Sequence, residues 1–294
     1  MFRDILKTFV LLTALSLLLL LLGSIFGGKT GLTMALVMAL VLNGFAYFFS
    51  DKIVLKMYRA QLMDRLKHPH IYEIVEDLAH TMNLPMPKLY IIPSSIANAF
   101  ATGRNPQNSS VAITAGIVDI LDDHELRGVL AHELSHIKNR DILFATIAAT
   151  IATAIGYMAQ YAHYAALFGS RDSRNRRNNP IGLLLAVILI PMAATLLRLG
   201  LSRSREYLAD DSGARYSNDP LALASALQKL ERHVSVAHLD NKNISRASTA
   251  QLFIVNPFKQ QITGRSLINL FSTHPPTQAR IARLQKIFEQ NISS

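Results

Sequence analysis

Long apolar runs alternate with polar segments along the chain. Two runs near the N-terminus, 9–26 and 30–50, contain no charged residue, and two further runs follow at 142–170 and 178–197. Each is about long enough to cross a bilayer, which takes roughly 20 apolar residues. The pattern predicts an integral membrane protein with two to four transmembrane helices. The first two runs form an N-terminal hairpin, and the last two either span the membrane or form a hairpin that does not cross it.

The polar segments carry a different periodicity. Residues 69–82 place Ile71, Val75 and Leu78 on one side, which is typical of an amphipathic helix. Segments 88–92 and 110–114 are β-rich and bounded by Pro, Asn and Gly, so they are expected to be strands. The predicted fold is therefore mainly α with a small β-sheet.

A metal-binding motif lies directly before the third apolar run. Residues 132–136 read HELSH, and the preceding Asp122 and Asp123 are typical helix-start residues. Residues four apart on a helix share a face, so His132 and His136 can hold one zinc ion. The intervening Glu133 can take a proton from a zinc-activated water.

Two histidines leave a catalytic zinc one protein ligand short. The best candidate follows the fourth apolar run, in SRSREYLAD at 202–210. Glu206 can act as a ligand, while Asp210, four residues later, can orient a ligand histidine. The alternative is a solvated acidic face, and spacing alone does not decide between the two.

Composition limits the metal ligands and the partners that the chain can have. The chain has 294 residues, is 50% hydrophobic, contains no cysteine and carries a net charge of +10. Without cysteine, a metal must use His, Asp or Glu. Basic residues that flank membrane spans account for the charge. A basic stripe with interleaved aromatic residues is absent from the sequence, so no nucleic-acid partner is expected.

Basic residues also predict the topology, because cytosolic flanks of membrane spans are rich in Lys and Arg. Arg3 and Lys7 precede the first run, Lys52 and Lys56 follow the second, and Arg198 follows the fourth. Both termini and the HELSH helix are therefore expected in the cytosol. The arginine-rich loop at 169–180 is the one segment that conflicts with this assignment.

Four motifs in order resemble the M48 family of membrane zinc metallopeptidases: NAFATG at 98–103, LAHELSHIKNRD at 130–141, SRSREYLAD at 202–210 and STHPPT at 272–277. The resemblance implies a zincin-like fold with one zinc ion held by His132, His136 and Glu206. It further implies that Glu133 is the catalytic base and that Asp210 supports a ligand histidine.

The resemblance also suggests residues for the substrate. Family members that cleave prenylated proteins place a histidine and an arginine six residues apart near the bound substrate, and His274 and Arg280 have that spacing. We expect this pair to help hold the oxyanion. Substrate is expected to add as a strand at a sheet edge near 98–103, which makes Asn98, Ala99 and Phe100 candidate substrate-binding residues.

These inferences divide the chain into four parts. Residues 1–50 form the transmembrane hairpin, 51–141 a cytosolic catalytic part, 142–200 the second apolar pair, and 201–294 a cytosolic part with the third ligand.

The resemblance to bacterial heat-shock members of the family implies a multi-pass protein of the bacterial inner membrane, whose partners are the lipid bilayer and misfolded membrane proteins that it degrades. The alternatives are a processing peptidase for a lipidated or precursor protein, and a non-catalytic membrane chaperone or scaffold with a vestigial zinc site.

Overall fold

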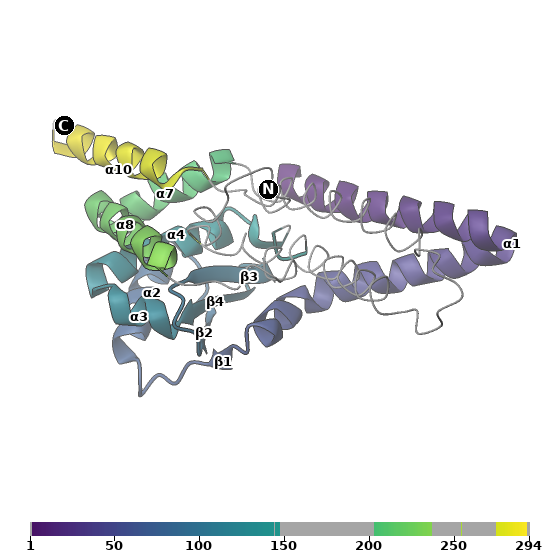
Figure 1. Ribbon diagram of the computed structural model, residues 1–294, viewed down its shortest axis with the longest axis horizontal. Helices are drawn as coiled ribbons and strands as arrows, with labels where there is room; N and C mark the ends of the chain where they lie inside the picture. Colours follow the sequence, from purple (N-terminus) through teal and green to yellow (C-terminus); the bar gives the residue numbers. More distant parts are fainter. Residues whose placement is uncertain (1, 144, 148–202, 237–253, 255–274, 293–294) are drawn as a thin grey trace, which may run out of the picture.

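The computed structural model describes residues 2–143, 145–147, 203–236, 254 and 275–292. Within these ranges the chain forms one small sheet and several helices, arranged as Figure 1 shows. The helices are α1 (Phe2–Met57), α2 (Pro69–Thr81), α3 (Ala115–Ile120), α4 (Asp123–Lys138), α7 (Arg203–Ser217), α8 (Pro220–Val236) and α10 (Thr277–Ile292). The strands are β1 (Gln61–Leu62), β2 (Lys88–Ile92), β3 (Ala99–Asn105) and β4 (Asn108–Thr114).

Helix α1 folds back on itself at Gly28, whose φ of 56° and ψ of −137° interrupt the helix. Glycine adopts this positive φ without steric penalty, so the two apolar arms lie as a hairpin that projects from the rest of the molecule (Figure 1). The second arm, Gly28–Met57, is the one segment among the described residues that is long and apolar enough to cross a membrane. Most of the third apolar run, 142–170, lies outside the described residues, and so do the whole fourth run, 178–197, and the arginine-rich loop between them.

The sheet has the order β1-β2-β4-β3. Strand β2 runs parallel to β4, and β1 and β3 are antiparallel to their neighbours. Strand β3 therefore lies at an edge of the sheet and pairs only with β4 along its described length. The expected strands at 88–92 and 110–114 are both present, whereas β3 was not expected as a strand.

The two faces of the sheet pack against different helices. Ala99, Val111 and Ile113 face the main core, where they meet side chains of α2 and α4 such as Val75 and Leu130. The opposite face packs against the end of α1, in a smaller cluster of Val54, Leu55, Ile92, Phe100 and Ala112. The sheet thus lies between α2 and α4 on one face and the end of α1, which continues the candidate membrane span, on the other.

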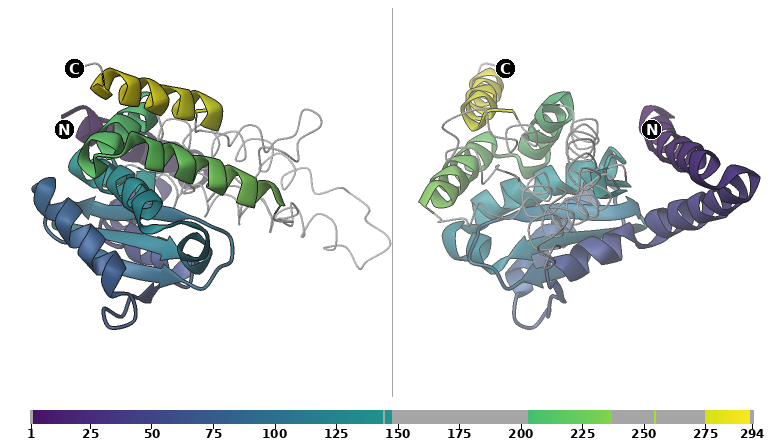
Figure 2. Two further views of the ribbon diagram at one scale, coloured as in Figure 1. Left: turned by 90° about the vertical axis from the view of Figure 1, so that its left-hand side faces the viewer. Right: turned by 45° about the vertical axis from the view of Figure 1, so that its right-hand side comes forward.

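Helix α4 is the central element, between the sheet on one side and α7 and α8 on the other (Figure 2). Its start is fixed by a capping box, in which Asp122 accepts from the Glu125 N–H and Glu125 accepts from the Asp122 N–H. The buried Glu125 carboxylate also accepts hydrogen bonds from Ser225 and Lys229 of α8. These bonds hold the N-terminal end of α4 against the second helical layer.

Glycine lets α7 approach α4 closely. A Cβ atom on Gly213 would lie 3.2 Å from both the N and Cα atoms of His132, so the backbones of the two helices meet at the first histidine of HELSH. Helix α10 lies outside this layer, where Leu284 contributes a buried side chain to the main core. The expected amphipathic helix at 69–82 is present as α2, and the expected HELSH helix is present as α4.

We predict that Gly103→Ala destabilises the edge strand. Gly103 has a φ of +141°, and an added Cβ would lie 2.3 Å from the carbonyl oxygen of Asn108. Strained backbone and overpacking together should lower the free energy of unfolding by about 1–3 kcal/mol. Thermal unfolding of the detergent-solubilised chain measures the loss. Gly44→Ala is the matched control, because a Cβ there meets nothing within 4 Å, and an equal fall in both variants would contradict the local explanation.

Candidate metal centre

Two helices bring three possible metal ligands together in the interior. Helix α4 supplies His132 and His136, one turn apart, and α7 supplies Glu206. One donor atom from each residue lies within 4.8 Å of the others. The two Nε2 atoms are 3.3 Å apart, and each is 3.7 Å from an oxygen of Glu206. Glu206 thus lies close to both histidines. The spacing within 202–210 alone had not decided between a ligand and a solvated acidic face.

The separations fit a single tetrahedral zinc ion. Nitrogen ligands bound at about 2.0–2.1 Å in a tetrahedral arrangement lie about 3.3–3.4 Å from one another, which matches the distance between the histidine nitrogens. The Glu206 oxygens lie a few tenths of an ångström further out. The donor set of two imidazoles and one carboxylate is one that catalytic zinc sites use, with a fourth position left for water.

Each histidine is oriented by a carboxylate at its other ring nitrogen. The His132 Nδ1 atom lies 3.0 Å from Asp210, and the His136 Nδ1 atom lies 3.1 Å from Asp141. Such contacts fix the ring so that Nε2 points toward the metal, and they make it a better ligand. Asp210 had been expected in this position. The contact of Asp141 with His136 had not been expected, because Asp141 lies beyond the end of α4. A left-handed turn at Arg140, whose φ is 59°, brings the chain back toward the helix.

The carboxylates also set the charge of the site without a metal. Burial alone would lower the pKa of His136, but the charge and hydrogen bond of Asp141, with the charges of Glu206 and Glu133, raise it to about 10. Zinc binding must therefore displace a proton from this ring. Metal affinity should weaken as the pH falls, because protons compete for the same nitrogen.

Glu133 lies beside the three ligands but is oriented toward the sheet. Its Oε2 atom accepts a hydrogen bond of 2.9 Å from the backbone N–H of Ala101 in β3. Burial raises the pKa of Glu133, against the lowering effect of His132 and His136. A carboxylate with a raised pKa is a stronger base, which suits a group that must accept a proton. Ala101 was missed in the sequence, because 98–103 was not expected as a strand.

The described contacts of Arg280, an expected oxyanion donor, are with Asp210 and Ile254. Its guanidinium is 1% exposed and donates two hydrogen bonds of 2.8 and 2.7 Å to the oxygens of Asp210. A third bond, of 2.7 Å, goes to the carbonyl of Ile254. Arg280 therefore holds the carboxylate whose Oδ1 atom lies 3.0 Å from the Nδ1 atom of His132. His274 lies outside the described residues.

The candidate substrate residues also have inward-facing side chains. Asn98 is 1% exposed and accepts a hydrogen bond from the Ile254 N–H, while Phe100 packs on Tyr58 of the α1 end at a ring distance of 5.2 Å. Ala99 is fully buried in the main core. The proposed contact of these three residues with substrate is therefore assigned to the backbone of the strand rather than to their buried side chains.

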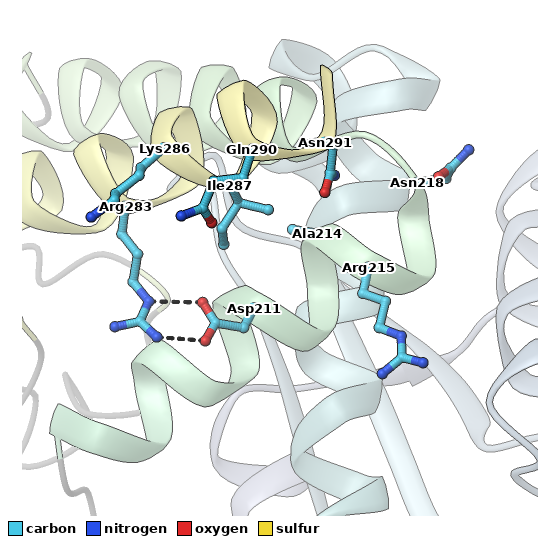
Figure 3. Close-up of a pocket in the computed structure, with 9 residues that line it drawn as sticks. All are labelled: Asp211, Ala214, Arg215, Asn218, Arg283, Lys286, Ile287, Gln290 and Asn291. Atoms are coloured by element: carbon cyan, nitrogen blue, oxygen red, sulfur yellow. Dashed lines mark hydrogen bonds and ion pairs between the residues drawn. The ribbon is translucent and has the colours of Figure 1, made fainter. Parts of the chain in front are cut away.

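A second arginine of α10 makes an outwardly similar contact. Arg283 donates two hydrogen bonds to Asp211, next to Asp210 on α7, at the rim of an open surface pocket of about 670 Å³ (Figure 3). The side chain of Arg283 is 48% exposed. The two arginine–aspartate pairs join the same two helices and differ mainly in burial, which makes them a natural comparison.

We predict that Arg280→Gln is far more damaging than Arg283→Gln. Removing Arg280 leaves the buried Asp210 charge without its partner, which typically lowers stability by about 3–5 kcal/mol. The exposed pair should contribute about 0–1 kcal/mol. Arg280→Gln should also bind zinc more weakly, by about 10–100-fold, because His132 loses its oriented carboxylate. Thermal unfolding and metal analysis test this, and equal effects of the two substitutions would contradict it.

Comparison with known proteins identifies the family. The model of peptidase family M48 matches residues 65–288. A "Protease HtpX homolog" of Syntrophobacter fumaroxidans is 50% identical over 96% of this chain and 98% of its own length. One from Thermococcus sibiricus is 48% identical over 97% of this chain and 96% of its own length.

A solved structure, that of S. mikatae Ste24p, shares the fold with a TM-score of 0.51 at 19% identity. The match covers 96% of this chain, and this chain spans 66% of the length of that protein. The resemblance inferred from the four motifs is confirmed by the family match and by the curated relatives. The chain belongs to peptidase family M48, and it is a protease of the metallopeptidase type.

Proposed function

We propose that the chain is a zinc-dependent endopeptidase that degrades damaged or misfolded membrane proteins. The observation that supports the proposal most directly is the convergence of His132, His136 and Glu206, with the buried Glu133 beside them. A site that only bound a structural metal would need no base next to its ligands. The alternative of a non-catalytic scaffold is therefore disfavoured.

The chemistry proposed for the site is hydrolysis by an activated water. His132, His136 and Glu206 would hold a zinc ion, which would lower the pKa of a bound water toward about 7 and act as a Lewis acid on the peptide carbonyl. Glu133 accepts the proton of the attacking water and returns it to the leaving amine. Its Oε2 atom is already engaged by the Ala101 N–H, so Oε1 is the atom that we assign to proton transfer.

The edge strand provides a backbone surface for substrate. The Thr114 N–H donates a hydrogen bond to the Asn98 carbonyl. Along an antiparallel pair of strands, residues whose backbone groups face the neighbour alternate with residues whose backbone groups face away from it. The N–H and C=O groups of Ala99, Ala101 and Gly103 then point away from β4, and Ala101 indeed donates to Glu133. An extended peptide added beside β3 would pass next to Glu133. Recognition through backbone groups accepts many sequences, which suits a protease for unfolded chains.

The membrane placement supports the choice of substrate. The end of α1 packs against β3 through Phe100, so the candidate span and the proposed substrate strand are directly joined. A protease attached in this way can reach segments of membrane proteins that have left the bilayer. We propose that the active site faces the cytosol of a bacterial cell, because basic residues dominate the flanks of the apolar runs.

We predict that two substitutions separate the base from the ligands. Glu133→Gln should keep about one zinc ion per chain and lose nearly all hydrolysis of an unfolded protein such as reduced casein. Glu206→Ala should lose both zinc and activity, because two histidines hold the ion poorly. Glu73→Gln, at an exposed position on α2, is the control and should match the wild type.

The assays are metal analysis and peptide release, each with and without a chelator. Wild-type turnover by Glu133→Gln would remove this residue from the mechanism. Full zinc occupancy in Glu206→Ala would show that another residue completes the site. Cleavage of one specific folded precursor, with unfolded proteins left intact, would favour a processing peptidase.

We further predict that position 67 lies in the cytosol. The chain has no cysteine, so Lys67→Cys introduces a single thiol at an exposed site between β1 and α2. An impermeant thiol reagent should label it only after the cells are permeabilised. A cysteine at position 175, in the arginine-rich loop, should be labelled in intact cells if the last two runs span. Labelling of Lys67→Cys in intact cells would place the catalytic part on the other side of the membrane.

A further inference from the structure

A second pocket, of about 280 Å³, lies where the end of α1 meets the sheet. It is formed by three separate parts of the chain: the last turns of α1, the start of β2 and the turn between β3 and β4. Basic side chains come from each part, namely Lys52, Lys88 and Arg104. The pocket is on the face of the sheet that packs against α1, because Lys88 alternates with Leu89, which is buried in the main core on the other face.

The basic groups of this pocket are not neutralised by carboxylates. Within the described ranges, none of Lys52, Lys88 and Arg104 forms an ion pair, and Asp51 is the single acidic residue that lines the pocket. Arg104 donates only to the amide oxygen of Asn108, at 3.3 Å. The rest of the lining is rich in groups that can donate hydrogen bonds, including Asn108 and the buried Ser110. Such a surface favours a ligand with negative charge and several acceptor oxygens.

Aromatic residues place this pocket at the level of a membrane surface. Phe45, Tyr47, Phe48 and Phe49 are exposed near the end of the apolar arm of α1, where an interfacial aromatic belt is typical. Arg104 lies over the ring of Phe48, and Lys52 over that of Phe49, each at 5.2 Å. The cations thus cover the aromatic belt on its polar side, which is the depth at which lipid phosphate groups lie.

We propose that this pocket binds the phosphate group of an anionic glycerophospholipid. The inference rests on the proposed membrane placement of α1, and it assigns a ligand to residues that the peptidase chemistry does not use. A phosphate held by Lys52, Lys88 and Arg104 would join α1 to the β3–β4 turn at the bilayer surface. The lipid would thereby fix the position of the edge strand relative to the membrane. A free phosphate ion has the same recognition chemistry, so the test must distinguish the two sources.

Tryptophan fluorescence in lipid vesicles provides the test, because the chain contains no tryptophan. Phe48→Trp places a reporter at the pocket, and Val37→Trp, at an exposed position within the apolar arm, reports on bulk lipid. The full chain is reconstituted in phosphatidylcholine with a small fraction of brominated lipid, which quenches nearby tryptophan. Brominated phosphatidylglycerol should quench Phe48→Trp more than brominated phosphatidylcholine does, whereas Val37→Trp should not discriminate.

Matched charge variants separate a site from general attraction. Lys88→Gln and Lys56→Gln each remove one exposed positive charge, but only Lys88 lines the pocket. Lys88→Gln should require about fivefold more phosphatidylglycerol for the same excess quenching, and Lys88→Gln/Arg104→Gln should show no excess. Lys56→Gln should match the parent. Native mass spectrometry of chains without added tryptophan should likewise retain phosphatidylglycerol on the wild type, retain less of it with Lys88→Gln and lose it with Lys88→Gln/Arg104→Gln.

Each other outcome overturns the proposal at a defined step. Equal losses for Lys88→Gln and Lys56→Gln would show diffuse attraction without a site. Removal of the excess by millimolar inorganic phosphate, with chloride of equal ionic strength as the control, would assign the pocket to free phosphate. No preference at Phe48→Trp, with Val37→Trp still quenched, would refute the lipid site while α1 remains in the membrane. Failure to quench Val37→Trp would refute the membrane placement itself.

Discussion

The buried pair of Asp210 and Arg280 is the contact on which the metal centre depends. Two opposite charges in a protein interior are stable only when they are paired with good geometry, because each has lost its hydration. Here two hydrogen bonds join Arg280 to the two oxygens of Asp210. One of these oxygens, Oδ1, also lies 3.0 Å from the Nδ1 atom of His132. The pair thus links α10 to α7 and α7 to α4. Burial would raise the pKa of Asp210, but Arg280 and His132 hold it below its ordinary value, so the carboxylate stays ionised.

The same region is held by close backbone packing. Gly213 brings α7 against the backbone of His132, and Gly128 brings α8 against α4 at Leu223. Side chains at these glycines would separate the helices that supply the ligands. Glu206 and Asp210, one turn apart on α7, therefore lie at the two ring nitrogens of His132, Nε2 and Nδ1 respectively. The positions of the three possible ligands follow from helix packing, and of the two carboxylates that contact the histidines at Nδ1 only Asp141 lies outside a helix.

Strand β3 connects this centre to the membrane side of the molecule. Phe100 packs against the end of α1, and the next residue, Ala101, donates its N–H to Glu133. The Phe100 side chain projects from one face of the sheet, whereas the Ala101 N–H points outward from its edge, so a single strand contacts both the candidate membrane helix and the proposed base.

Much of this arrangement could be predicted from the sequence. HELSH on a capped helix, the helix at 69–81 and the apolar hairpin each follow from local periodicity and capping signals. The pairing of Asp141 with His136, and of Arg280 with Asp210, could not be derived in this way. The first depends on a left-handed turn at Arg140, and the second joins residues 70 positions apart. Strand β3 was missed because its small residues, in NAFATG, give no clear alternation, and its pairing with β4 determines the structure instead.

A zinc absorption spectrum of the purified full chain tests the central claim most directly. With zinc held by His132, His136 and Glu206, the extended fine structure should show nitrogen and oxygen neighbours at about 2.0–2.1 Å and the outer-shell scattering of two imidazole rings. Glu133→Gln should leave this spectrum unchanged, since Glu133 is not a ligand. A signal from three imidazoles, or a first shell that changes in Glu133→Gln, would contradict the assigned ligand set.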